Sequence, residues 1–594
     1  MTISLCTIPD ELKLRILHFA GWRAAVQLGA TSKQFNDVCS EPTFWKRAVK
    51  ETFRMRVDHF SKDGNWRGAF QTLASGRLYG WGQNWHLMFN SHEFNPKRSQ
   101  KKHCHFPNEI ADKQYQGVVD VQSGGWSVSL LTLSGAVVIS GSLDGATAWA
   151  GYKPRTLNFS NADERITQIS SGRCHLLALS DSGQIWSARG SGPTSQPALI
   201  QFMTPMGAVE NPICTKVIAG WSASGALIQN HGLFLWFDQA THSQSRPISP
   251  YHENAVPPVR EVDIKRIPYF VDIFGDVMDK DRVVDFAIGE HLVILVTSSG
   301  KVFALDIENQ QEEIVPMQLV NIVAPEGSSK IDRVEGKFRE FAVFNSDGLV
   351  HLLKDENIKA QFALLTPQPY SAIPEIRTST VSPHSVEELK NYHIVDISFG
   401  DWHVLALTDT GKVLTWGRDS GSCGALGHGD QEAAEKIGVR YEYRDGILEK
   451  PTPVKFGEGE FYAYKVSAAG WRSCALVAEV NGQSALTAGG LIPKGERMEV
   501  GKGKGKEEQA EGYRQNGVSP PMERGHQGGI AGVPSDARGG SVSLSEVAMA
   551  NQPNATSFFG LSPSNHLFAP QLNGAHIGGS GGNGQERNGN TGDE

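Results

Sequence analysis

The residues that could carry out chemistry in this sequence do not form a known catalytic pattern. Gly501 to Lys506 alternates Gly with Lys, but it lacks the Gly-x-x-x-x-Gly-Lys-Ser/Thr spacing of a phosphate-binding loop. No Gly-x-Ser-x-Gly pattern lies between a strand pattern and a helix pattern, as a nucleophile elbow requires, and the sequence contains no His-Glu-x-x-His helix. Its seven Cys include no Cys-x-x-Cys pair, so they indicate neither a zinc site nor a disulfide framework. We therefore predict no catalytic residue, no metal ligand and no cofactor.

Two histidines occupy the same place in a recurring pattern. His175 lies three residues after Gly172, and His403 lies three residues after Gly400. A residue that recurs because a structural unit recurs is better interpreted as a packing and hydrogen-bonding group than as a catalytic base. The recurring unit itself is therefore the feature to explain.

The unit consists of two short apolar strands around a Gly turn. In its clearest copy, Val395 to Gly417, residues alternate in polarity before Gly400, an apolar run follows, and Gly411 marks a turn to a last strand. A long period of short strands is typical of a propeller or a solenoid. We predict seven copies with structural roles for their first glycines and for one strand end, namely Gly124, Gly172, Gly220, Gly289, Gly336, Gly400 and Gly470, together with Trp416 and Gly417.

A half copy near the start of the pattern favours the propeller. Gly76 to Asn84 matches the second half of the unit but follows no first half, whereas the copy at Gly470 has a first half and no matching second half. The two halves could complete one blade and close a ring, which would remove the exposed sheet edges of a linear array. We predict a mainly β fold with a seven-bladed propeller over residues 76–485.

The units resemble the repeats of the regulator of chromosome condensation family. The resemblance rests on Trp416-Gly417, on the Gly424-Ala-Leu-Gly427 segment, and on the Gly-x-x-His pairs at Gly172 and Gly400. It covers about residues 70 to 485, and several copies are degenerate. The resemblance implies a propeller fold. Guanine nucleotide exchange on a small GTPase, the activity of the name-giving members of that family, stays open as an alternative, and chromatin binding through the ring is another.

Residues 1–55 differ in kind from the repeats. Pro9 with Asp10 and Glu11 is typical of a first helical turn, and Gly21 could end that helix. Further helices are expected around Val26 to Val38 and from Phe44. Three short helices bury little surface alone, so such a segment often needs a partner.

In order and spacing, these residues resemble an F-box. The motif appears as Ile8-Pro9-x-Glu11-Leu12, Ile16-Leu17, Ser32-Lys33-x-Phe35 and Phe44-Trp45-Lys46. The resemblance implies binding to the Skp-type adaptor of a cullin-RING ubiquitin ligase. We predict adaptor-binding roles for Ile8, Pro9, Leu12, Ile16, Leu17, Leu28, Ser32, Phe35 and Trp45. The alternative is a small helical cap packed on the propeller.

The remaining segments are a linker and a tail. Residues 56–75 link the two parts, and Trp66 and Phe70 suggest that this linker packs. Residues 486–594 are rich in Gly and poor in apolar residues, so we predict that they are disordered.

Composition limits the remaining functions. The net charge is −8 and the pI about 6.2, so nucleic acid is not an expected partner. No apolar run approaches the roughly 20 residues of a membrane helix, no signal peptide is expected, and free thiols suit a reducing compartment. We expect a non-enzymatic substrate receptor of an SCF-type ligase in the cytoplasm, the nucleus or both. Its propeller would hold a target protein for ubiquitination and degradation by the proteasome.

Overall fold

The computed structural model describes part of the chain. Residues 480–594 lie outside this part, and with them the predicted C-terminal tail. The described residues are 8–55, 65–84, 89, 103–111, 115–145, 154–159, 164–190, 196–204, 206–237, 259–267, 281–308, 319–323, 329–363 and 376–479.

Within the described residues, four helices precede the first strand: α1 (Asp10–Gly29), α2 (Lys33–Cys39), α3 (Pro42–Phe53) and α4 (Trp66–Ala74). Gly21 adopts a φ of +80° inside α1, so the backbone breaks there as predicted. The hydroxyl of Ser32 accepts a hydrogen bond from the Phe35 amide at 3.3 Å and starts α2, while Pro42 occupies the first turn of α3. Local sequence signals thus set most of these boundaries.

The helices share a buried aromatic core. Trp45 is 2% exposed, and its indole donates a hydrogen bond to the Cys39 carbonyl at 2.6 Å. Phe70 of α4 packs against Trp45 at 5.2 Å and against Phe53 at 5.3 Å between ring centroids. Trp66 and Phe70 are buried, so the described part of the segment predicted as a packed linker does pack, and residues 66–74 of it form α4.

The described strands form seven sheets, which confirms the predicted seven-bladed propeller. The first three sheets are, in spatial order, β3 (Val118–Ser123), β4 (Ser127–Thr132), β5 (Val137–Gly141), β6 (Arg155–Thr156); β7 (Ile166–Ser171), β8 (His175–Ser180), β9 (Ile185–Arg189), β10 (Ala198–Thr204), β11 (Gly207–Ala208), with β15 (Val259–Asp263) parallel to β10; and β12 (Cys214–Ala219), β13 (Ala223–Ile228), β14 (Gly232–Phe237), β16 (Lys265–Ile267).

The next three sheets follow the same plan. They are β17 (Val283–Ile288), β18 (Leu292–Thr297), β19 (Val302–Asp306), β20 (Leu319–Ile322), β24 (Ile376–Val381); β21 (Ile331–Lys337), β22 (Glu340–Asn345), β23 (Val350–Lys354), β25 (His384–Ser385); and β26 (Ile394–Phe399), β27 (His403–Thr408), β28 (Val413–Asp419), β30 (Asp445–Pro453), β29 (Arg440–Glu442). Short helices lie between strands: α6 (Asp355–Ala363), η6 (Glu387–Asn391), η7 (Ser420–Ser422) and α7 (Gln431–Glu435).

The seventh sheet joins the two ends of the propeller. Its order is β2 (His103–Glu109), β1 (Arg77–Gln83), β32 (Arg472–Glu479), β31 (Phe461–Ala469). Strand β1 pairs with β32 in antiparallel register, with Leu78 opposite Leu476. The predicted completion of a split blade is therefore confirmed. Each first strand contacts the first strand of the next sheet, and β31 contacts β3, so the ring is closed.

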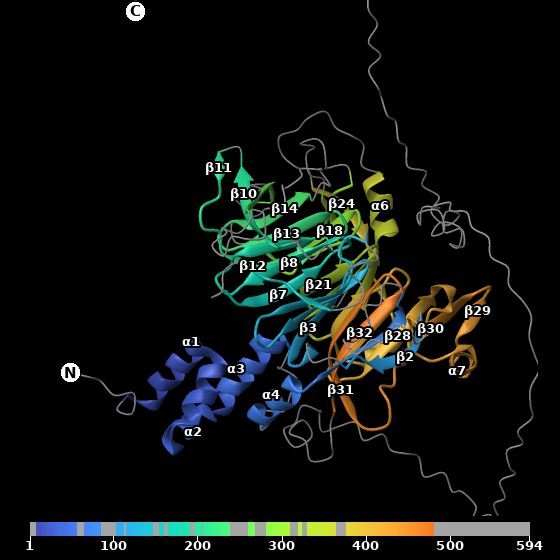
Figure 1. Cartoon of the computed structure of the whole chain (residues 1–594). Helices are drawn as coiled ribbons and strands as arrows, with labels where there is room; N and C mark the ends of the chain where they lie inside the picture. The colour runs from blue at the N-terminus through green and yellow to red at the C-terminus, as the bar shows by residue number, and fades with distance from the viewer. Residues whose placement is uncertain are drawn as a thin grey trace, which may run out of the picture. The chain divides into compact units, whose positions relative to one another are not determined.

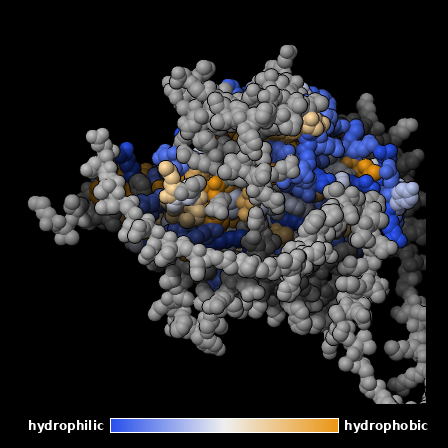
Figure 2. All heavy atoms as spheres, turned by 90° about the horizontal axis from the view of Figure 1, so that it is seen from above, coloured by the Kyte–Doolittle hydropathy of each residue, from blue (hydrophilic) through white to orange (hydrophobic). Residues whose placement is uncertain are grey.

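The helices lie against one edge of this ring. Helices α3 and α4 contact β3, and α4 also contacts β32 (Figure 1). One continuous hydrophobic core joins the helices to the first blades. In the view of Figure 2, hydrophobic residues form small patches among hydrophilic ones.

Candidate protein-interaction surfaces

The predicted adaptor-binding residues divide into an exposed group and a buried group. Leu12 and Ile16 are 44% and 43% exposed, and Pro9 is also exposed. Leu12 and Ile16 lie four residues apart in α1, so they share one helix face. Exposed apolar side chains on one helix face suit a protein partner. Ile8 and Leu28 are half-buried.

The second group of predicted residues is buried or caps a helix. Leu17 and Trp45 are each 2% exposed and Phe35 is 8% exposed, so their side chains belong to the helical core rather than to a contact surface. Ser32 is exposed, and its hydroxyl caps α2. These four residues help to hold the helices in place, and their predicted role in adaptor binding stays a prediction. The motif could not separate the groups, because apolar residues appear in it for both reasons.

One exposed apolar residue was not on the predicted list. Val26, in the part of α1 after Gly21, is 44% exposed. The sequence placed it in an apolar helical pattern, which favours burial. Its exposure adds a further apolar side chain to the surface of the helical segment.

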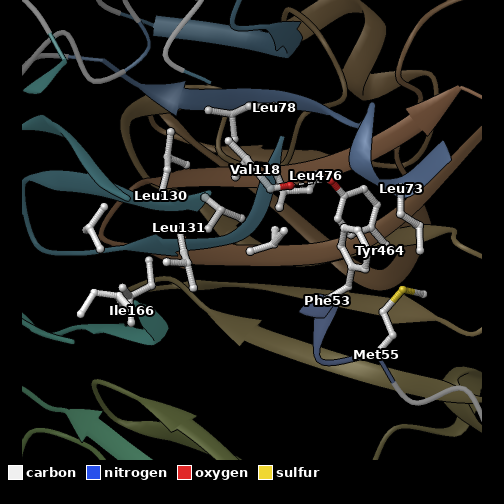
Figure 3. Close-up of a cluster of buried hydrophobic side chains, with 14 of the residues drawn as sticks. Phe53, Met55, Leu73, Leu78, Val118, Leu130, Leu131, Ile166, Tyr464 and Leu476 are labelled. Atoms are coloured by element: carbon white, nitrogen blue, oxygen red, sulfur yellow. Dashed lines mark hydrogen bonds between the residues drawn. The ribbon is translucent and has the colours of Figure 1, made fainter. Parts of the chain in front are cut away.

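The junction between helices and propeller is apolar and specific. Phe53 of α3 packs edge-on against Tyr464 of β31, with 5.7 Å between ring centroids, and Leu73 of α4 is fully buried beside them. The Tyr464 hydroxyl donates a hydrogen bond to the Val118 carbonyl at 3.1 Å (Figure 3). The Arg23 guanidinium donates another to the carbonyl of Leu133. These contacts fix the orientation of the helical segment on the ring.

A cavity of about 340 Å³ runs between the first strands of the blades. In all seven first strands the register shifts at a β-bulge near the strand start. A bulge re-aims the side chain beside it. The residues that follow the bulges are all polar, and in ring order they are Asp120, Gln168, Lys216, Asp285, Arg333, Asp396 and Lys465.

The charges of this polar ring alternate in sign and pair across blades. Lys216 forms an ion pair with Asp285, and the Lys465 ammonium lies 3.1 Å from the Asp396 carboxylate. The Asp285 carboxylate also accepts a hydrogen bond from the Val334 amide of the next blade at 2.9 Å. Paired charges that bridge neighbouring blades stabilise the ring. In five of the seven copies the polar-ring residue lies four positions before the repeat glycine, a spacing that can be read from the sequence.

The carboxyl group of Glu335, which lies near the polar ring, has a raised pKa. Burial, and then the neighbouring Asp396, raise the pKa of Glu335 to about 8. Burial alone would also raise the pKa of Asp396, but Lys465, the hydrogen bond with Glu335 and Arg333 together outweigh it and hold that pKa below its usual value. Glu335 is therefore the group of this pair that holds a proton near neutral pH.

The repeat glycines lie where the sequence analysis placed them, at or next to the ends of the first strands. At Gly172 an added Cβ would lie 2.3 Å from the Gly220 carbonyl oxygen of the next blade, so no larger residue fits there. Gly417 has a φ of +104°, and Trp416 beside it is 8% exposed. These positions serve the packing of one blade on the next.

The repeat histidines also join blades. His175 Nε2 lies 2.8 Å from the Ser224 hydroxyl, and His403 Nε2 lies 2.9 Å from the Ser473 hydroxyl. Burial lowers the pKa of His175 to about 3 and that of His403 to about 4, so both rings are neutral at physiological pH. The predicted packing and hydrogen-bonding role is confirmed.

The described residues provide neither a metal-binding cluster nor a membrane-spanning helix. The part of the chain that the structure describes contains no group of three or more His, Cys, Asp or Glu placed to hold a metal ion. Among the helices described, none is long and apolar enough to span a membrane.

Two family models match the chain. Residues 5–51 match the F-box-like model, and residues 394–425 match the model of the regulator of chromosome condensation (RCC1) repeat. Both motifs identified in the sequence are thus confirmed at the predicted places.

Two fungal proteins are similar to longer stretches of the chain. SCF-associated factor 1 of Saccharomyces cerevisiae is 25% identical over 320 residues, which are 53% of this chain and 42% of the relative. F-box protein pof9 of Schizosaccharomyces pombe is 21% identical over 483 residues, 78% of this chain and 88% of the relative. The chain therefore matches less than half the length of the first of these relatives.

Solved structures resemble the fold more distantly. Prp20p of Saccharomyces cerevisiae has a TM-score of 0.47 at 14% identity and covers 74% of this chain and 96% of its own. Human WBSCR16 has a TM-score of 0.43 at 14% identity and covers 68% of this chain and 100% of its own.

Proposed function

We propose that this protein is the substrate receptor of an SCF-type ubiquitin ligase. Its helical segment binds a Skp-type adaptor and through it a cullin, and its propeller holds a protein that is ubiquitinated and degraded. The observation that carries the proposal is the pair of exposed apolar side chains, Leu12 and Ile16, on α1 of an F-box-like segment. The names of the two fungal relatives support it.

The mechanism is proximity. The receptor brings a target protein next to the ligase and so raises its effective concentration there. The packed junction through Phe53 and Tyr464 suits this task, because a helical segment packed on the ring would present a bound target in a defined direction. In this proposal no residue of the chain takes part in the ubiquitin chemistry, and the protein acts in the cytoplasm, the nucleus or both. No observation on the described residues favours nucleotide exchange or chromatin binding.

The test is adaptor binding by the full chain and by the double variant Leu12→Asp, Ile16→Asp. We expect the variant to bind a purified Skp-type adaptor at least about thirtyfold more weakly, since loss of interface anchors costs roughly 2 kcal/mol or more. Both positions are exposed, so the melting temperature should change little.

Met206→Asp is the matched control. Met206 is fully exposed on the propeller, and the same change there should leave adaptor binding as in the wild type. Equal adaptor binding by the wild type and the double variant would contradict the proposed contact. No adaptor binding by the wild type would leave the helical segment as a cap and refute the proposed function.

A further inference from the structure

The loops that follow the first strands form a second surface, at the end of the cavity away from Tyr464. Backbone hydrogen bonds link these loops from blade to blade. The Gly125 amide donates to the Arg173 carbonyl at 3.2 Å, and the Arg173 amide donates to the Gly220 carbonyl at 3.1 Å. The Asp401 amide likewise donates to the Gly470 carbonyl at 2.8 Å. We call this ring of loops the mouth, and its side chains include Trp126, Arg173, Trp221, Lys337, Phe338, Asp401, Trp402 and Arg472.

The mouth is rich in stacked aromatic and cationic groups. The Arg173 guanidinium lies 3.5 Å from the ring centroid of Trp221 and 4.8 Å from that of Trp126. Trp221 stacks on Phe338 with 4.8 Å between centroids. Trp402 is 53% exposed although it is a large aromatic residue. Flat, pre-ordered aromatic and guanidinium groups are what protein-binding surfaces use as anchors.

The cations of the mouth lack carboxylate partners. Among the described residues no carboxylate forms an ion pair with Arg173, Lys337 or Arg472. Lys337 donates to the Ser123 carbonyl, and Arg472 donates to the carbonyls of Gly124 and Gly125 at 3.1 and 2.7 Å. The polar ring deeper in the cavity differs, because its lysines are paired.

The charge around the mouth is therefore unbalanced. Asp401 is the carboxyl group that Arg173, Lys337 and Arg472 act on, and Glu290 is already paired with Arg339 at 2.7 Å. Three cations face one unpaired carboxyl, an excess of two positive charges in a chain whose net charge is −8. Burial, and then Arg472, lower the pKa of Lys337 to about 8. An incoming anion would relieve this repulsion.

The opposite end of the cavity is occupied by the chain itself. Arg54 and Met55, which follow α3, line the cavity there together with Asp120 and Tyr464. Helices α3 and α4 pack on that side of the ring. The mouth is thus the end of the cavity that the helical segment leaves open.

We propose that the mouth binds an acidic segment of the target protein. This inference rests on the proposed receptor function and names the chemistry of its target. Acidic groups of the segment contact Arg173 and Lys337, which are both half-buried, while an apolar side chain packs on Trp402. Lys337 also lines the cavity. The buried Arg472 adds positive charge from below.

The test is fluorescence anisotropy of the full chain with labelled peptides of Glu, Gly and Leu. Control peptides carry Lys in place of every Glu, and a third set carries phosphoserine there. We expect the Glu peptide to bind, to bind more weakly as salt rises, and to bind far more tightly than the Lys peptide. Tighter binding of the phosphoserine peptide would identify phosphate, rather than carboxylate, as the preferred anion.

Variants locate the binding site. Arg173→Glu should weaken binding of the Glu peptide at least about tenfold, because it replaces an attraction by a repulsion. Trp402→Ala should weaken it about threefold or more. Arg282→Glu, at an exposed arginine outside the mouth, should leave it unchanged. Arg173→Lys keeps the charge but loses the flat stacking group, and should give an intermediate loss with the fold intact.

Two results would overturn the inference: equal binding of the Glu and Lys peptides, or unchanged binding by a folded Arg173→Glu variant. Adaptor binding is measured on the same proteins. If the adaptor binds and the acidic peptide does not, the mouth inference fails alone. If the peptide binds at the mouth and the adaptor does not, the proposed ligase function fails instead.

Discussion

At the scale of single residues, Glu335 makes a prediction about pH. Its pKa is raised from 4.5 to about 8, so the folded protein holds this proton more tightly than the unfolded chain. Such a group favours folding at low pH, and stability falls as pH rises from about 4.5 to about 8. Glu335→Gln removes this pH-dependent contribution to the free energy of unfolding. Between pH 5.5 and 8, the free energy of unfolding of the variant, measured with urea, should therefore decline less steeply than that of the wild type.

The control for this prediction is Glu458→Gln, at an exposed carboxyl group. It should leave the pH dependence as in the wild type. Asp396 does not confuse the result, because its pKa lies below its usual value and the group stays ionised across this window. Parallel pH profiles for Glu335→Gln and the wild type would contradict the assignment.

Some residue roles could be predicted from the sequence, and others could not. The repeat glycines and His175 and His403 could be placed from sequence, since recurrence alone indicates a structural role. The polar ring was missed, because a β-bulge shifts side-chain direction by one residue and breaks simple alternation. The burial of Trp45 and Phe35 could not be read from the motif, since it depends on how α2, α3 and α4 pack.

At the scale of elements, the junction of α3 with β31 makes a prediction about stability. Phe53 is 1% exposed between Phe70 and Tyr464, so Phe53→Ala leaves a cavity and costs about 3 kcal/mol. We expect the helices to detach and melt before the propeller, which would appear as a new low-temperature transition in calorimetry. Phe106→Ala, at a side chain that is 52% exposed, is the control and should melt as the wild type does.

Adaptor binding shows whether Phe53→Ala only weakens the junction or also disrupts the proposed adaptor-binding surface. Leu12 and Ile16 lie on α1, away from Phe53 in sequence, so the variant should still bind adaptor below its first transition. A single transition at the wild-type temperature would show that the junction does not couple the helices to the ring. The sequence indicated that Trp66 and Phe70 pack, but it did not indicate α4, because Gly68 and the short length weaken the helical pattern.

At the scale of the whole molecule, closure of the ring could be predicted from the sequence, but the position of the helices on the ring could not. A half copy at each end of a repeat array leaves one topological solution, in which β1 completes the blade of β31 and β32. The contacts of Phe53 and Leu73 with the ring involve residues that belong to no repeat. No periodicity could therefore place them.

Closure of the ring predicts that a disrupted β1 destabilises strands from both ends of the propeller sequence. Strand β1 lies between β2 and β32, and Leu78 pairs with Leu476 inside this sheet, so proline is not tolerated at position 78. In Leu78→Pro we expect faster hydrogen exchange not only in residues 77–83 but also in residues 103–109 and 472–479, nearly 400 positions away in sequence. Native-state exchange with mass spectrometry measures this directly.

The matched control is Ala208→Pro in β11, the outermost strand of its sheet. There the faster exchange should stay within β10 and β11, because no other strand depends on that edge. If Leu78→Pro accelerated exchange in β1 alone, β32 would keep its protection without a partner on that side, and the ring would not be held closed by this strand. Spread to both ends, against a local effect in the control, is what a closed seven-bladed ring requires.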